Sequence, residues 1–152
     1  MTELPEVHVL FNRFAIALAL GLFIGFEREM EKAGTFAGIR TFPLISMLGC
    51  MAALLHDQSV TWAFPVILLI LAAFVLAAYF FVSSAASPGI TTEISSLLAF
   101  LFGALAWWQM SGLAAALAVV TVLLLASKKP LEGLAQKIGH SDLNAGLQFA
   151  VI

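Results

Sequence analysis

The chain has 152 residues, of which 62% are apolar and 11% are charged, and its formal net charge is −2. Soluble domains carry about 25% charged residues, so this composition excludes an ordinary soluble domain, and the small net charge does not predict a nucleic-acid partner. The single cysteine, Cys50, excludes an internal disulfide. At about 20 residues per crossing, the chain can span a bilayer about five or six times. We therefore expect an all-α, polytopic membrane protein that contacts the lipid bilayer.

Three apolar segments occupy the first half of the chain. We predict membrane spans at residues 7–26, 40–55 and 62–82. The polar turn HDQSVT at 56–61 separates the second span from the third. The loop SSAASPG at 83–89 ends the third span, because a Pro-Gly pair breaks a helix.

The uncharged segment at residues 94–127 is too long for one span. Its 34 residues would form a helix of about 51 Å, whereas the hydrocarbon core is about 30 Å thick. We place a turn in WWQMSG at 107–112, because tryptophan favours the headgroup region and Ser-Gly favours a tight turn. Five helices then form a membrane domain at residues 1–127. Residues 128–152 form a cytoplasmic tail with a short amphipathic helix and the start of a further helix.

The basic residues of the predicted loops fall into two groups. Arg28, Lys32 and Arg40 follow the first span, and Lys128, Lys129 and Lys137 follow the fifth. Five spans place both groups on one side of the membrane, and the positive-inside rule makes that side the cytoplasm. The charge pattern therefore predicts five spans with the N-terminus outside.

The stretch GFEREMEKAGTFAGIR carries six charged residues in the fourteen positions from Glu27 to Arg40. Glu27 near the end of one helix and Arg40 at the start of the next are each unfavourable to the dipole of their own helix. One hypothesis is that these two residues form an interhelical ion pair that offsets both penalties. The alternative is a solvated helix end, in which Arg28 pairs with Glu31 one turn away.

Thr91, Thr92 and Glu93 begin the predicted fourth span. In the first turn of a helix, threonine can cap and glutamate complements the dipole. The functional alternative is a metal site, because the predicted topology brings Glu27 and Glu93 to the same membrane face. Mg²⁺ binds one or two carboxylates and keeps several waters, and Thr41 or Thr92 would supply neutral oxygen ligands.

Small residues recur at four-residue spacing on two predicted spans. They are Ala17, Gly21 and Gly25 on the first span and Ala99 and Gly103 on the fourth. Such stripes let helices approach closely. They serve either packing within one protomer or self-association, and we expect a homo-oligomer, with a dimer formed through the first span.

Enzyme chemistry has little support in the sequence. His8, His56 and His140 are scattered through predicted loops, and no cysteine or serine stands at a catalytic spacing from them. We expect that the protein is not an enzyme. Mg²⁺ is the one cofactor that its carboxylates suggest.

Two separated motifs give the chain a family resemblance. The sequences GLFIGFERE and AGIRTFPLI, followed by GITTE at 89–93, resemble the signature of the MgtC/SapB family of bacterial inner-membrane proteins. The resemblance carries the family's motif positions over to Glu27, Arg28, Arg40, Thr41, Thr91 and Thr92. The chain departs from the family pattern at Glu93, where many members have alanine. Its SDLNAGLQFAVI tail is most similar to the subgroup in which a second membrane domain of unknown function follows the MgtC-like domain.

The resemblance implies a multi-pass protein of the bacterial inner (plasma) membrane that takes part in magnesium homeostasis. Members are described as magnesium transport proteins, and some act by binding other membrane proteins, including the ATP synthase. We therefore expect a Mg²⁺ transport-related or regulatory membrane protein. The alternative is an interaction module that modulates an ATP synthase or a transporter and has no ion site of its own.

Overall fold

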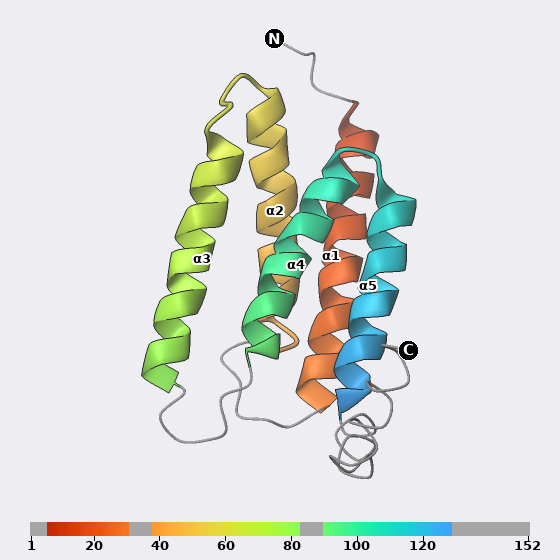
Figure 1. Ribbon diagram of the computed structural model, residues 1–152. Helices are drawn as coiled ribbons and strands as arrows, with labels where there is room; N and C mark the ends of the chain where they lie inside the picture. The colour runs from red at the N-terminus through yellow and green to blue at the C-terminus, as the bar shows by residue number, and fades with distance from the viewer. Residues whose placement is uncertain (1–5, 31–37, 83–89, 129–152) are drawn as a thin grey trace, which may run out of the picture.

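The computed structural model describes residues 6–30, 38–82 and 90–128, and these residues form five α-helices and no strand. The helices are α1 (Val7–Met30), α2 (Thr41–Asp57), α3 (Ala63–Val82), α4 (Thr91–Trp107) and α5 (Ser111–Ala126). Successive helices run in opposite directions and form an up-and-down bundle (Figure 1). The predicted all-α organisation with five helices is confirmed. The predicted tail lies, from residue 129 onward, outside the described residues.

The two ends of the bundle differ in how the helices are connected. At one end, which we call the turn end, short turns join α2 to α3 and α4 to α5 (Figure 1). Ser59 and Gln109 have positive φ angles of 80° and 61° in these turns. A continuous helix does not accommodate a left-handed residue, so the conformation of Gln109 confirms the predicted break within 107–112. The opposite end, where α2 and α4 begin, is called the charged end below.

The first helix is longer than the sequence predicted. We expected it to end at residue 26, before the charged residues, but α1 continues to Met30. The physical reason is that Arg28 is buried within the bundle. The charged stretch is therefore partly a packed segment of helix and not only a loop.

α4 is the central helix of the bundle. It contacts each of the other four helices, and its buried residues extend from Thr92 to Trp107. α3 stands at the edge of the bundle and leaves most of its apolar surface uncovered by protein (Figure 1). The core therefore lies where α4 packs between α1 and α2.

α2 and α4 approach each other backbone to backbone. A Cβ atom added to Gly49 would collide with the carbonyl oxygen of Phe100, and one added to Gly103 would collide with that of Ser46. Only glycine leaves room for such a contact. Ala99, the other member of the stripe predicted on the fourth span, is fully buried.

The small-residue stripe of α1 also packs inside the protomer. A Cβ atom on Gly21 would lie 2.5 Å from the Cα atom of Pro43, and one on Gly25 would lie 3.0 Å from the Cα atom of Ile39. Ala17 is fully buried as well. These small residues are therefore used in packing between α1 and α2 within the protomer, and the expected dimer stays a prediction.

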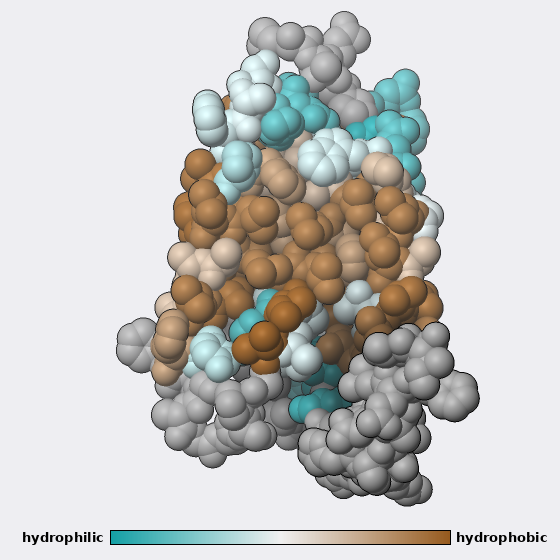
Figure 2. Space-filling view, viewed as in Figure 1, coloured by the Kyte–Doolittle hydropathy of each residue, from teal (hydrophilic) through white to brown (hydrophobic). Residues whose placement is uncertain are grey.

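The surface around the middle of the bundle is apolar. Figure 2 shows a broad band of hydrophobic residues with hydrophilic residues above it. Two segments, α1 and residues Ala63–Phe80 of α3, are long and apolar enough to cross a bilayer, and the other three helices are shorter apolar helices of 16 or 17 residues. Membrane-spanning helices have about 17–25 residues, so these three lie at the lower limit. An apolar surface of this extent would be unfavourable in water.

Candidate functional site at the charged end

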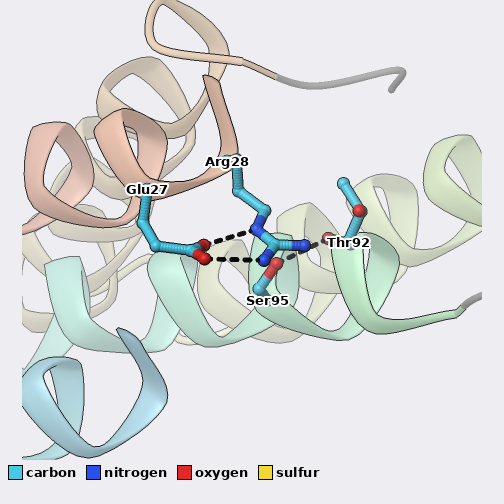
Figure 3. Close-up of polar contacts among 4 residues, drawn as sticks. All are labelled: Glu27, Arg28, Thr92 and Ser95. Atoms are coloured by element: carbon cyan, nitrogen blue, oxygen red, sulfur yellow. Dashed lines mark hydrogen bonds and ion pairs between the residues drawn. The ribbon is translucent and has the colours of Figure 1, made fainter. Parts of the chain in front are cut away.

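Glu27 and Arg28 form a two-point ion pair near the end of α1. The Nε atom of Arg28 donates to Oε2 of Glu27 at 2.7 Å, and its Nη2 atom donates to Oε1 at 3.0 Å (Figure 3). The side chain of Arg28 is only 3% exposed, and that of Glu27 is 14% exposed. Two-point pairing between arginine and a carboxylate is among the strongest of charge-assisted contacts. The pair therefore neutralises both charges where little water reaches them.

The first turn of α4 forms the other wall of this site. Figure 3 shows Arg28 extending from α1 toward Thr92 and Ser95. These two residues are buried, with 6% and 1% of their surface exposed. The hydroxyl of Ser95 donates to the carbonyl oxygen of Thr92 at 2.9 Å, so it is used within its own helix. Arg28 itself lies in the last turn of α1, where a cation complements the helix dipole.

The predicted ion pair between Glu27 and Arg40 is not formed. Arg40 is exposed and directly precedes α2, and within the described residues Glu27 pairs with Arg28. The alternative of a solvated helix end is also wrong for Arg28, which is buried; Glu31 lies outside the described residues. Side chains of adjacent helical residues diverge by about 100°, so a contact between them requires both to bend into one space. The space between α1 and α4 provides it (Figure 3).

Glu29 makes the link that the sequence analysis assigned to Glu27. Its Oε2 atom accepts the backbone N–H of Ile39 at 3.2 Å. This contact joins the end of α1 to the residues just before α2, ten positions along the chain. The sequence does not show which of the two acids, Glu27 or Glu29, reaches the residues before α2, because both lie near the end of α1.

Glu93 faces a different neighbour from Glu27. It lines a groove between α3 and α4 together with Tyr79, whereas Glu27 contacts Arg28 on α1. Thr91 is exposed, and Thr41 uses its backbone N–H to bond the carbonyl of Gly38 at 3.0 Å. No group of three or more His, Cys, Asp and Glu residues that could hold a metal ion is found within the described ranges. A Mg²⁺ site shared by Glu27 and Glu93 stays a prediction.

A second buried arginine, Arg13, lies toward the turn end and was missed in the sequence analysis. Its side chain is 9% exposed, and its Cζ atom lies 4.6 Å from the ring centroid of Trp107, a cation–π contact. The Nε1 atom of Trp107 donates to Oδ2 of Asp57 at 2.7 Å. Trp107 is only 2% exposed, so its predicted role as a headgroup anchor is wrong. The sequence signal that could have revealed Arg13 is a lone arginine inside an apolar span.

The fold and its charged sites together define a class of protein. Five apolar helices enclose the ion pair of Glu27 and Arg28 toward one end of the bundle and the contact of Arg13 with Trp107 toward the other. Their outer surface is apolar, which is the organisation of a helical membrane protein.

The family follows from comparison with known proteins. The model of the MgtC family matches residues 14–134, most of the chain, and the protein belongs to this family of membrane proteins. The match contains all the motif positions of the sequence analysis, from Glu27 to Glu93, and it does not address the subgroup with a second domain. Comparison with curated proteins and with solved structures finds no match.

Proposed function

We propose that the protein acts in magnesium homeostasis at the bacterial inner membrane as a regulatory membrane protein that modulates another membrane protein and does not conduct Mg²⁺ itself. The observation that carries the proposal is the ion pair of Glu27 and Arg28, in which both carboxylate oxygens already bind a buried guanidinium group. Family membership supports the connection with magnesium.

Binding of Mg²⁺ at Glu27 would require displacement of Arg28 from the carboxylate. The displaced guanidinium is 3% exposed and would remain buried beside a divalent cation. A buried charge without its partner is strongly unfavourable, and two like charges in a region of low dielectric add repulsion. Arg28 therefore disfavours binding of a metal ion at Glu27, the acidic residue of the family motif.

The packing of the core supports the same conclusion. Gly49 and Gly103 bring the backbones of α2 and α4 into direct contact, so a path for a hydrated ion between these helices would require them to separate. The apolar outer faces of α3 and α5 are open to contact with lipid or with another membrane protein. An ATP synthase or a transporter is the kind of partner that the family resemblance implies.

Measurement of Mg²⁺ flux tests this proposal. Purified protein in liposomes that contain a fluorescent Mg²⁺ indicator should give the same influx as protein-free liposomes, while a reconstituted Mg²⁺ channel serves as positive control. In cells that depend on the protein for growth in low Mg²⁺, Arg28→Met should abolish growth and Lys128→Met, at an exposed residue outside the family motifs, should not. Saturable Mg²⁺ influx that disappears in Glu27→Gln would contradict the regulatory role and support transport.

We further propose five membrane spans with the N-terminus outside. Arg28, Arg40 and Lys128 lie toward the charged end of the bundle, and Arg13 stacks on Trp107 toward the turn end. In a Cys50→Ser background, Gln58→Cys should react with an impermeant thiol reagent from the outside and Lys128→Cys only from the cytoplasm. Labelling of Gln58→Cys from the cytoplasm would show the opposite orientation.

A further inference from the structure

An apolar groove separates the charged-end halves of α3 and α4. Its volume is about 260 Å³, and apolar side chains of both helices line it, among them Val75, Leu76 and Ile94. Leu76 and Ile94 are 57% and 49% exposed, so the groove opens on the side that would face lipid. We call it the α3–α4 groove.

Two polar groups in the lining of the groove form no side-chain hydrogen bond to the described residues. The Oε2 atom of Glu93 is buried and accepts no hydrogen bond within the described residues. Tyr79, across the groove on α3, makes a ring contact with Phe80, but its hydroxyl forms no hydrogen bond to the described part of the chain. A buried carboxylate oxygen without a donor is unfavourable, so the groove favours a ligand that brings one.

We infer that the α3–α4 groove binds an aminophospholipid of the bilayer, with the ammonium group on Glu93, an acyl chain along Val75 and Leu76, and a headgroup oxygen near the hydroxyl of Tyr79. The three parts of such a lipid match the three features of the groove: an unpartnered acceptor, an apolar wall and a hydroxyl donor. The inference does not depend on the proposed regulatory function.

The depth of the groove fits a lipid headgroup. Glu93 lies in the first turn of α4, and Tyr79 lies near the end of α3, so both polar groups are at the charged end of the bundle. Val75 and Leu76 lie about one turn farther toward the middle of α3, among its apolar residues. An ammonium group and an acyl chain occupy these two depths in a bilayer.

Other occupants fit the groove less well. A hydrated Mg²⁺ ion needs several polar contacts for its waters, whereas the walls around Glu93 are apolar. A helix of another protein is about 10–12 Å across with its side chains, and drug-sized ligands occupy pockets of about 300–1,000 Å³. A groove of about 260 Å³ cannot enclose either, but it can take part of one acyl chain while the rest of the lipid stays in the bilayer.

Lipid retention measured by native mass spectrometry tests the inference. The full-length protein is exposed to phosphatidylethanolamine or to phosphatidylcholine with the same acyl chains. Both headgroups carry one positive charge, but only the ethanolamine has N–H groups to donate to Glu93. We expect about a tenfold preference for phosphatidylethanolamine, equivalent to about 1.4 kcal/mol, and little preference in Glu93→Gln.

A second pair of variants tests the groove without changing its charge. Ala72 lines the groove, so Ala72→Leu should fill it and reduce retention of phosphatidylethanolamine. The adjacent Ala73 is exposed and lies outside the lining, so Ala73→Leu is a matched control that should retain the lipid. Thermal unfolding of each variant verifies that it is folded.

Three results would overturn the inference. They are equal retention of the two lipids by the unchanged protein, an unchanged preference in Glu93→Gln, and full retention by folded Ala72→Leu. A cation site is tested in phosphatidylcholine alone, with Mg²⁺ as the added ligand. If Mg²⁺ raises the melting temperature of the unchanged protein but not that of Glu93→Gln, the groove binds a metal ion instead.

Discussion

Replacing Arg28 with methionine should destabilise the protein by about 3 kcal/mol or more, because removal of one partner leaves the other charge of a buried pair unpaired. The carboxylate of Glu27, whose side chain is only 14% exposed, would then have no guanidinium group to neutralise it. Arg28→Lys should recover only part of the loss, because an ammonium group cannot reproduce the two-point contact at 2.7 and 3.0 Å. Chemical unfolding in mixed micelles measures the difference.

A matched control is provided by Arg40, an exposed arginine at the same end of the bundle. Arg40→Met should change the free energy of unfolding by less than about 0.5 kcal/mol, as exposed substitutions usually do. The double variant Glu27→Gln with Arg28→Met should be more stable than Arg28→Met alone, because no charge is left buried. Equal effects at Arg28 and Arg40 would show that burial of the ion pair contributes nothing to stability.

Gly49→Ala and Gly103→Ala should each destabilise the bundle by about 3 kcal/mol or more, at or above the upper end of the range for overpacking. The added methyl group would meet a backbone carbonyl oxygen, that of Phe100 or Ser46, and not a side chain that can rotate away. Because α4 contacts all the other helices, displacement of α2 from α4 disturbs the whole core. Thermal unfolding and the yield of folded protein measure the effect.

Gly112→Ala serves as the control for both glycine variants. A Cβ atom on Gly112, in the first turn of α5, would have no neighbour within 4 Å. Alanine favours a helix over glycine by up to about 1 kcal/mol, so this variant should be neutral or slightly more stable. If Gly49→Ala were as stable as Gly112→Ala, the direct contact between the backbones of α2 and α4 would be contradicted.

The helices could be predicted from the sequence because their limits are set locally. The turn between α4 and α5 depends on the backbone conformation of a few residues, with Gln109 left-handed, although the Ser-Gly pair expected to form it begins α5. The predicted Pro-Gly break lies outside the described residues. The end of α1 could not be predicted in this way. Whether Arg28 ends a helix or extends it depends on the space that α4 leaves beside it, and that space is a property of the tertiary structure.

The partners of the charged residues were harder to predict than their importance. Glu27 and Arg28 were both recognised, but the pairing of Glu27 with Arg40 assumed that α1 turns this acid toward α2. The rotation of a helix about its axis is set by its whole packed face, here the contact of Gly21 and Gly25 with α2. Arg13 was missed for a related reason, because its partner Trp107 is distant along the chain.

The unequal connections of the bundle determine where it can change shape. α3 is joined to α2 at the turn end by a short turn, and beside it the ring of His56 on α2 meets that of Phe64 on α3 edge to face. With 20 residues, α3 is about 30 Å long. Tilting α3 by about 5° about that turn would displace its far end by about 2.5 Å. The distance between α3 and α4 beside Glu93 is therefore sensitive to a small tilt of α3 about a turn at the opposite end of the bundle.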